Sequence, residues 1–297
     1  MEKNNMKELF IIDANSLIHR AFHALPPFTS PDGKPTGALY GITNILLKIL
    51  RERAPEYVVA AYDTPEATFR EKDFAEYKGT RAPTDSTLIP QIIESKNIFD
   101  LLGIKRIEHP GWEADDIVAT LAKKFSDDLN VVIFSGDLDI LQAVRGKRVV
   151  AITPKKGISE SITYDEDKVL ERFLLPPEKL ADYKGLVGDT SDNIPGVKGI
   201  GPKTAAMLIQ KYGTLEDMYK EIEELGMSNA ALLKKLVAGK ESALMSKKLA
   251  KLDAGMQIDI KLKDLRALTP DAEKLIKYLD MLGFKGLVAR LKRENGV

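Results

Sequence analysis

Nine acidic residues stand in separated groups along the chain, most of them where a run of apolar residues stops. They are Asp13, Asp63, Glu113, Asp115, Asp116, Asp137, Asp139, Asp189 and Asp192. Carboxylates that a fold gathers repel one another, so they need divalent cations or lysine and arginine partners. Hard cations such as Mg²⁺ and Mn²⁺ prefer carboxylate oxygens, and a pair of such ions can hold both oxygens of a phosphoryl displacement. The acids therefore either form a metal site or decorate the surface.

No other set of residues offers a rival catalytic centre. The chain has three histidines, His19, His23 and His109, and no cysteine, so zinc spacings of His and Cys are absent, as is a nucleophile elbow. His19 and His23 are four residues apart on a predicted helix and could bind a metal together. We favour the simpler interpretation that they lie on a polar stripe facing the surface.

Each acidic group also has an ordinary explanation when it is considered alone. Glu113, Asp115 and Asp116 fall in the first turn of a predicted helix, where acids complement the partial positive charge of the helix N-terminus. Asp137 and Asp139 would suit a loop, and the Asp189 to Asp192 stretch would suit a turn. It is their joint placement that favours one site.

The elements around the acids alternate between short apolar runs and helical patterns. The predicted strands are Leu9 to Ile12, Tyr57 to Tyr62, Val131 to Phe134 and Val149 to Ile152. The predicted helices between them include Thr36 to Leu50, Leu88 to Leu102 and Ala114 to Phe125. This alternation is typical of an α/β fold with a mostly parallel central sheet flanked by helices.

Ligands of such sheets bind beyond the carboxyl ends of the strands. Asp13 directly follows the first predicted strand, Asp63 directly follows the second, and Asp137 lies just past Phe134. We therefore expect these acids to meet at one edge of the sheet.

The composition of the chain changes at about residue 175. We predict an α/β core over residues 1–174 and a helical region over residues 175–297, which begins with Pro176 and Pro177 and has glycine-rich turns. Within the first part, residues 64–87 form a polar, basic segment, too polar for a core helix. This basic segment is expected to be a mobile functional loop or an exposed surface helix. It contains Phe69, Arg70, Lys72, Phe74, Tyr77, Lys78 and Arg81.

A glycine-rich loop over residues 196–205 superficially suggests a nucleotide-phosphate cradle. Pro202 stands between Gly201 and Lys203, and no strand precedes the loop, so the Walker pattern fails. The loop instead joins two helical patterns, Leu180 to Val187 and Thr204 to Tyr212. A glycine turn there can present backbone N–H groups to a nucleic-acid phosphate without regard to base sequence. The alternative is a tight turn between helices.

Bulk composition leaves a polyanionic partner open. The 44 basic and 44 acidic residues cancel, so a metal that neutralises the clustered acids would leave a basic surface. No apolar run approaches the roughly 20 residues of a membrane span, and the polar N-terminus is not a signal peptide. The absence of cysteine fits a reducing compartment, and we expect a cytoplasmic location without a membrane partner.

Taken together, the motifs resemble the 5′ nuclease or flap endonuclease family, most closely the N-terminal 5′-3′ exonuclease domain of bacterial DNA polymerase I. The resemblance covers essentially the whole chain. It rests on Ile12-Asp-Ala-Asn-Ser16, Phe69-Arg70, Tyr77-Lys-Gly-Thr-Arg81, Glu113-Ala-Asp-Asp116, Ser135-Gly-Asp-Leu-Asp139, Gly188-Asp-Thr-Ser-Asp-Asn-Ile-Pro-Gly-Val197 and the glycine-rich loop.

The resemblance implies a PIN-like nuclease core with two Mg²⁺ or Mn²⁺ ions and a metal-activated water that leaves a 5′-phosphate. One ion would be bound chiefly by Asp13, Asp63, Glu113 and Asp115. The other would be bound, partly through water, by Asp116, Asp137, Asp139, Asp189 and Asp192. Among these, Asp116 is also expected to be catalytic.

The resemblance also assigns the polyanion contacts. Lys78 and Arg81 match gateway residues that steer a 5′ single strand and stabilise transition-state charge, which makes them catalytic candidates. The glycine-rich loop corresponds to a helix-hairpin-helix element over about residues 185–212, which in relatives can hold K⁺. The expected DNA contacts are His19, Arg20, Arg70, Tyr77, Lys78, Arg81, Gly196, Lys198, Gly199, Gly201, Lys203 and Thr204. His19 stands where relatives usually carry a stacking tyrosine.

The implied function is 5′-3′ exonuclease and flap endonuclease action on DNA flaps, nicks and 5′ ends, for RNA primer removal and repair. We expect a monomer that is either a stand-alone nuclease or a domain fused to a DNA polymerase, since the chain stops near where the exonuclease domain of that polymerase ends. A catalytically inactive DNA-junction-binding module is the main alternative. A phosphatase of the haloacid dehalogenase type would need an aspartate where Asn15 stands.

Overall fold

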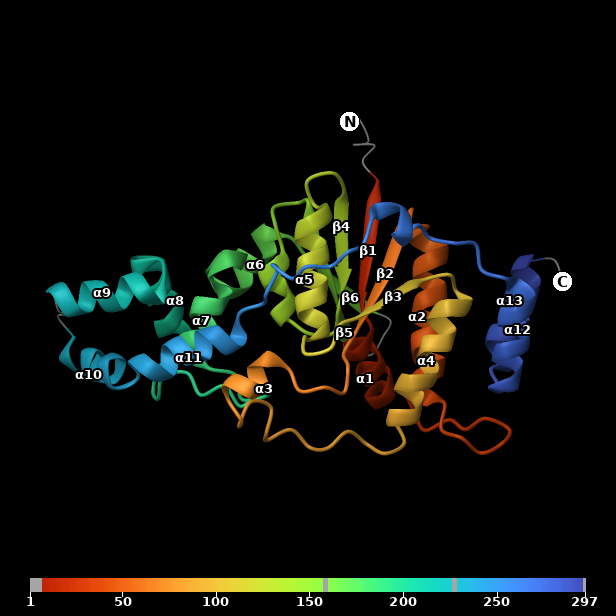
Figure 1. Cartoon of the computed structure of the whole chain (residues 1–297), viewed down its shortest axis with the longest axis horizontal. Helices are drawn as coiled ribbons and strands as arrows, with labels where there is room; N and C mark the ends of the chain where they lie inside the picture. The colour runs from red at the N-terminus through yellow and green to blue at the C-terminus, as the bar shows by residue number, and fades with distance from the viewer. Residues whose placement is uncertain (1–6, 157–159, 226–228, 296–297) are drawn as a thin grey trace.

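A six-stranded sheet is the central element of the computed structural model, which describes residues 7–156, 160–225 and 229–295 (Figure 1). The strand order is β3-β2-β1-β4-β5-β6, and every neighbouring pair is parallel except β5 and β6. The strands are β1 (Glu8–Asp13), β2 (Tyr57–Tyr62), β3 (Lys105–Glu108), β4 (Asn130–Phe134), β5 (Val149–Lys156) and β6 (Glu160–Tyr164). The predicted α/β fold with a mostly parallel sheet is confirmed.

The four strands predicted from apolar runs are β1, β2, β4 and β5, whereas the two edge strands were not predicted. The sequence of β3 is Lys-Arg-Ile-Glu, and most of β6 is exposed. An edge strand pairs on one side only and commonly carries charged residues, so neither strand shows a buried apolar run.

Helices fill the chain between and after the strands. They are α1 (Ala14–Ala24), α2 (Gly37–Arg53), α3 (Phe69–Asp73), α4 (Ile89–Leu101), α5 (Ala114–Phe125), α6 (Glu166–Phe173), α7 (Leu180–Val187), α8 (Pro202–Tyr212), α9 (Leu215–Leu225), α10 (Ala230–Ala238), α11 (Lys240–Ala250), α12 (Ala272–Met281) and α13 (Lys285–Asn295). Short 3-10 helices are η1 (Asp139–Ala143), η2 (Pro177–Lys179) and η3 (Leu262–Leu265). Among the described residues, no helix combines the length and apolar character needed to cross a membrane.

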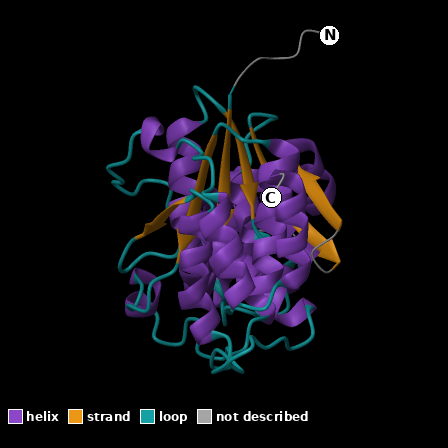
Figure 2. Cartoon of the chain, turned by 90° about the vertical axis from the view of Figure 1, so that its right-hand side faces the viewer, coloured by secondary structure: helices purple, strands orange, loops and turns teal. Residues whose placement is uncertain are grey.

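Helices cover both faces of the sheet, and the alternation of side chains along β1 shows why (Figure 2). Phe10 and Ile12 are buried against α1, α2, α12 and α13, whereas Leu9 and Ile11 are buried against α5. Successive side chains of a strand point to opposite faces, so a strand buried on both sides must be apolar throughout. The sheet therefore has two cores, and β1 runs between them.

The C-terminal helices divide between two places. Helices α7 to α11 surround an apolar cluster of their own, which includes Leu186, Leu208 and Leu236. Helices α12 and α13 instead return to the sheet, where Leu275, Leu279 and other apolar residues join the core that contains Phe10. In Figure 1 they lie at the opposite end of the molecule from α9 and α10. Within residues 175–297, the last two helices therefore bury their apolar faces in the sheet core, whereas α7 to α11 bury theirs against one another.

The basic segment, residues 64–87, contains one helical turn, α3, and the remainder has no regular secondary structure apart from turns. Thr68 caps α3, accepting a hydrogen bond from the Glu71 N–H while the Glu71 carboxylate accepts one from the Thr68 N–H. This capping box fixes the start of the helix. Arg70, the second residue of α3, is buried, although the segment is otherwise mostly exposed.

Arg70 forms the most buried ion pair of the described residues. Its guanidinium donates to both oxygens of Asp116 at 2.7 and 2.8 Å, and these side chains are 2% and 0% exposed. It also donates to Glu113 at 3.1 Å and to the carbonyl oxygens of Leu249 and Lys251 at 2.8 Å. One side chain thus joins α3, α5 and the end of α11, three segments that are distant in sequence.

Two glycines shape the turn that carries Asp189 and the residues after it. Gly188 and Gly196 have φ angles of +77° and +62°, in the region that favours glycine. A Cβ atom on Gly196 would lie 2.3 Å from the nitrogen of Gly188, so the two backbone segments touch. Asp189 and Ile194 exchange backbone hydrogen bonds of 2.8 Å across the same turn. The turn therefore depends on the absence of side chains.

Substitution of Gly196 by alanine should lower the free energy of unfolding by about 3 kcal/mol or more. The strain of a positive φ alone costs about 1–3 kcal/mol, and the backbone clash adds to it. Gly201→Ala is the matched control, since Gly201 has a negative φ and nothing lies within 4 Å of its Cβ position. Urea unfolding monitored by circular dichroism measures both. Equal unfolding midpoints for the two variants would contradict this account of the turn.

Replacement of Arg70 by methionine should cost roughly 3–5 kcal/mol, because it leaves buried Asp116 without a counter-charge. Arg106→Met is the control: Arg106 makes a comparable two-bond pair with Asp100, but the Asp100 side chain is 55% exposed, so a loss below about 1 kcal/mol is expected. The double variant Arg70→Met, Asp116→Leu should recover part of the loss. Similar urea midpoints for Arg70→Met and Arg106→Met would rule out a structural role for the buried pair.

Candidate active site

Three strand ends deliver acids to one edge of the sheet. Strand β1 lies between β2 and β4, with Asp13 opposite Ala61 and Ile12 opposite Phe134. Asp63 follows β2 by one residue, and Asp137 follows β4 by three. The strand register therefore places Asp13, Asp63 and Asp137 at the carboxyl edge of the sheet, where the sequence predicted them.

Asp13 is buried at the junction of β1 and α1. Its carboxylate caps α1 by accepting the Ser16 N–H at 3.2 Å, and it accepts the Ser135 hydroxyl at 2.6 Å. Burial raises the pKa of Asp13 to about 7, and the nearby charge of Asp63 adds to the rise while the Ser135 hydrogen bond opposes it. A cation close to this carboxylate would favour its ionised form.

Asp115 lies in the first turn of α5, at the same edge of the sheet. The neighbouring Ala114 N–H donates to the Asp63 carboxylate at 2.7 Å, which joins the start of α5 to the end of β2. The Asp115 carboxylate makes no hydrogen bond or ion pair with the described residues. Burial raises its pKa well above the usual value, and the negative charges of Asp13, Asp137, Asp63 and Asp139 raise it further. This carboxylate is thus surrounded by like charge.

The other acids have basic partners. In the basic segment, Lys78 donates to Glu113 at 2.5 Å and Arg81 pairs with Asp192. The hydroxyl of Tyr77 donates to the same two acids at 3.2 and 3.3 Å. Burial raises the pKa of Tyr77, and the charges of Glu113 and Asp192 raise it further, so the phenol stays a donor. The basic segment therefore lies against the acids through these three side chains.

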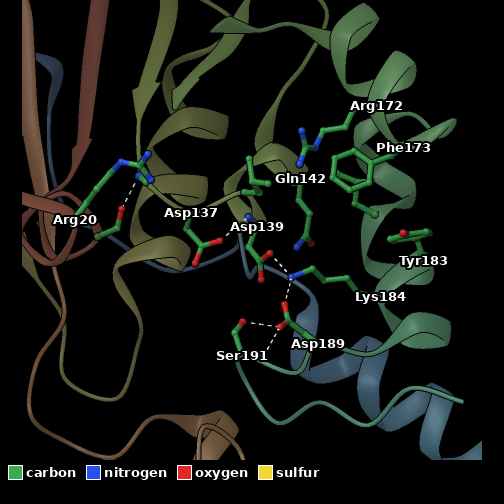
Figure 3. Close-up of a pocket in the computed structure, with 14 residues that line it drawn as sticks. Arg20, Asp137, Asp139, Gln142, Arg172, Phe173, Tyr183, Lys184, Asp189 and Ser191 are labelled. Atoms are coloured by element: carbon green, nitrogen blue, oxygen red, sulfur yellow. Dashed lines mark hydrogen bonds and ion pairs between the residues drawn. The ribbon is translucent and has the colours of Figure 1, made fainter. Parts of the chain in front are cut away.

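Lys184 of α7 binds the remaining two acids, and the sequence analysis did not identify it (Figure 3). Its ammonium pairs with Asp139 and donates to Asp189 at 2.6 Å. Burial raises the pKa of Asp139 to about 6, and the charge of Asp137 adds to the rise while Lys184 opposes it. The only signal in the sequence was a lysine in a predicted helix shortly before Asp189.

The predicted ligands of the two ions therefore regroup by their partners. Asp13, Asp63, Asp115 and Asp137 form no ion pair with a basic side chain in the described part of the chain; we call them the open acids. Asp116, assigned to the second ion and to catalysis, is instead fully buried in its pair with Arg70. Arg70, expected to contact DNA, is directed into the protein by the same pair.

The open acids fit hard divalent cations by donor chemistry, since all their donors are carboxylate oxygens. No three described acidic or histidine side chains converge to coordination distance as they stand. Mutual repulsion of uncompensated carboxylates accounts for this spread. A cation would therefore have to draw the open acids inward.

Two cavities flank the acids. One, of about 720 Å³, is lined by His19, Asp63, Lys78, Arg81 and Glu113, among others, and so gathers several expected DNA contacts. The second, of about 550 Å³, is lined by Arg20, Asp137, Asp139, Lys184 and Asp189 (Figure 3). Burial lowers the pKa of His19, and the charge of His23 lowers it further, so a neutral ring faces the first cavity near neutral pH.

The glycine-rich loop follows α7 and runs into the first turn of α8, which begins at Pro202, two residues before the predicted start at Thr204. Lys198, Gly199, Gly201 and Lys203 are exposed there, and Thr204 is half-buried. Gly196 is buried and its N–H donates to Ser246 at 3.0 Å, so it shapes the turn instead of facing solvent. Lys235 donates to the Gly199 carbonyl at 3.2 Å, which places a further positive charge at the loop.

Models of known protein families match most of the chain. Residues 8–174 match the 5′-3′ exonuclease N-terminal resolvase-like domain, and residues 175–273 match the 5′-3′ exonuclease C-terminal SAM fold. A 5′-3′ exonuclease of Aquifex aeolicus is 38% identical over 97% of this chain and 96% of its own length. The DNA polymerase I of Bacillus subtilis is 40% identical over 97% of this chain. The chain spans about a third of that polymerase's length, 33%.

Solved structures share the fold at low sequence identity. A zinc-bound T5 5′-exonuclease has a TM-score of 0.67 at 21% identity, with 97% of this chain and 98% of that chain covered. The catalytic core of Rad2 in complex with DNA substrate has a TM-score of 0.64 at 18% identity, with coverages of 93% and 88%. These neighbours share the expected fold, an α/β core followed by helices. The chain belongs to the 5′-3′ exonuclease family.

Proposed function

We propose that this chain is a metal-dependent, structure-specific 5′ nuclease that hydrolyses phosphodiesters near the 5′ ends of DNA. One observation carries the proposal. Four open acids from three strand ends and the first turn of α5 gather at one edge, beside a cavity to which Lys78 and Arg81 contribute positive charge. A phosphodiester at that edge would contact cations on one side and the acids on the other.

The proposed cofactors are two Mg²⁺ or Mn²⁺ ions. Asp13, Asp63 and Asp115 would hold one ion, with Glu113 nearby, and Asp137, Asp139, Asp189 and Asp192 would hold the other. Bound divalent cations would supply the positive charge that activates an attacking water and stabilises the leaving oxygen. We also propose that K⁺ binds at the glycine-rich loop, through carbonyl groups other than that of Gly199, which accepts from Lys235.

Side chains of the basic segment would handle the substrate. Lys78 and Arg81 line the larger cavity, and both would exchange a carboxylate partner for a phosphate oxygen of the entering strand. Guanidinium and ammonium groups at a phosphate stabilise the negative charge that develops during its displacement. His19 and Tyr77 would complete this wall, the neutral His19 ring by stacking on a base.

The proposed substrates are DNA flaps, nicks and 5′ ends, including RNA primers on DNA. The exposed loop with Lys198, Lys203 and Thr204 would hold a duplex backbone, since phosphate contacts position a duplex without reading its sequence. Arg20 would add a contact from the smaller cavity. We propose a cytoplasmic monomer that acts in primer removal and repair, alone or with a DNA polymerase, with a division of function at about residue 174.

A catalytically inactive junction-binding module is the second candidate, and the paired acids favour it. Glu113, Asp139, Asp189 and Asp192 have lysine or arginine counter-ions in the structure. Such pairs could stabilise a binding surface without any cation. The open acids count against this candidate, because their repulsion has no structural benefit unless a ligand relieves it.

Cleavage of a labelled 5′ flap should require Mg²⁺ or Mn²⁺ and should fall by at least about a hundredfold in Asp115→Asn. Asp115 suits this test because its carboxylate has no structural partner, whereas Asp116→Ala would leave Arg70 buried and unpaired. Asp128→Asn, at an exposed position, is the matched control. An intact flap with the unsubstituted chain and Mg²⁺, together with junction binding that EDTA does not affect, would establish the inactive module instead.

Divalent cations should raise the unfolding temperature more at about pH 8 than at about pH 5.5. The pKa of Asp13 is raised to about 7, and the pKa of Asp115 is raised as well. Without metal, the fold therefore loses stability as the pH rises from the carboxyl pKa of the unfolded chain, about 4, through the raised pKa values of the folded chain. Mg²⁺ at about ten times its Kd would add about 1.4 kcal/mol per ion. Differential scanning calorimetry measures both, with NaCl of equal ionic strength as control; equal shifts at the two pH values would contradict cation binding at these acids.

A further inference from the structure

Lys184 separates the acidic edge into two electrostatically different halves. On one side are the open acids, which have no basic partner among the described residues. On the other, the Lys184 ammonium lies between Asp139 and Asp189, one positive charge against two negative ones (Figure 3). These three side chains are 17%, 18% and 19% exposed, so solvent screens their attraction only in part.

The position of the ammonium matters because a second divalent cation would bind the same two carboxylates. Lys184 uses Oδ1 of Asp139 and Oδ2 of Asp189, and Asp189 Oδ1 accepts from the Ser191 N–H and hydroxyl at 2.9 and 2.6 Å. A cation that binds both carboxylates must therefore either displace the ammonium or lie beside it, and the two positive charges then repel each other. Hydrogen bonds between charged groups are the strong ones, so this displacement opposes binding.

The cavity beside Lys184 contains other charged side chains. Arg20 and Arg172 line it together with Asp137 (Figure 3). Arg20 donates to the Lys155 carbonyl at 3.1 Å and Arg172 to the Tyr164 hydroxyl at 3.2 Å. An ammonium that leaves Asp139 and Asp189 for this cavity therefore approaches two further cationic side chains.

We propose that Lys184 is a built-in counter-ion that occupies the second-cation position of the free protein, so that divalent cations load first at the open acids and only weakly at Asp139 and Asp189. This inference rests on the proposed metal-dependent function. It assigns Lys184 a positioning role, because the residue acts by holding two carboxylates and by competing with the cation.

Mn²⁺ titration of the full chain without DNA tests the inference, by isothermal calorimetry and by electron paramagnetic resonance of free Mn²⁺. The unsubstituted chain should bind one ion at least about tenfold more tightly than the other. Lys184→Met should tighten the weaker site by about tenfold or more, which is the scale of losing charged hydrogen bonds that oppose the ion. Lys184→Arg, which keeps the positive charge, should retain the weak site.

Lys179→Met is the matched control, since it makes the same change of net charge from a position that forms no ion pair among the described residues; its two affinities should stay within about twofold of the unsubstituted values. Thermal unfolding in EDTA and in Mn²⁺ checks folding. Lys184→Met should unfold at a lower temperature in EDTA and gain more from Mn²⁺ than the unsubstituted chain.

Unchanged or weaker Mn²⁺ binding by Lys184→Met, in a chain that folds and cleaves a flap, would overturn the role of Lys184 alone. If none of the proteins bound Mn²⁺, the role of Lys184 and the proposed function would both be wrong. If the weaker site became tighter by the same factor in Lys184→Met and Lys179→Met, the effect would come from the change of net charge alone, and the inference would also be overturned.

Discussion

Repulsion among carboxylates at the carboxyl edge of the sheet is the constraint on which the surrounding architecture depends. The parallel register brings acids to this edge. Segments distant in sequence then supply the compensating charge: Arg70, Lys78 and Arg81 come from the basic segment, and Lys184 comes from α7. A polar segment that would otherwise be solvated thereby packs against the sheet domain. The acids thus organise the fold around the edge as well as providing the chemistry proposed there.

The pair between Arg70 and Asp116 has a different role from the exposed pairs of the molecule. It is buried and also binds backbone carbonyl groups at the end of α11, where Asp116 accepts the Asp253 N–H as well. Such a pair tolerates little displacement, because a shift of any one segment leaves charge buried without a partner. The relative positions of α3, α5 and α11, and with them the separation of Tyr77 from Glu113, are consequently fixed by one guanidinium.

Sequence reasoning predicted what local patterns determine and failed where tertiary packing decides. Buried strands such as β1 are apolar along their length, and strand ends place Asp13 and Asp63, so sheet and edge were predictable. The edge strands β3 and β6 have no such pattern. Arg70 was expected at the surface because its neighbours are polar, but its pair with Asp116 is buried. The pairing of Lys184 with Asp139 depends on how α7 packs against η1, and the periodicity of the sequence does not predict that packing.

The return of α12 and α13 to the sheet has a topological consequence. Residues on both sides of the helices α7 to α11 contribute to the core that contains Phe10. Those five helices are therefore, in space, an insertion into the sheet domain, although along the chain they follow it. Insertions of this kind have both ends anchored in the host, so they cannot swing as a tethered neighbour can. The glycine-rich loop is accordingly held at a defined distance from the acids by two crossings of the chain, and a fragment that ended before α12 would expose the apolar surface beneath Leu275 and Leu279.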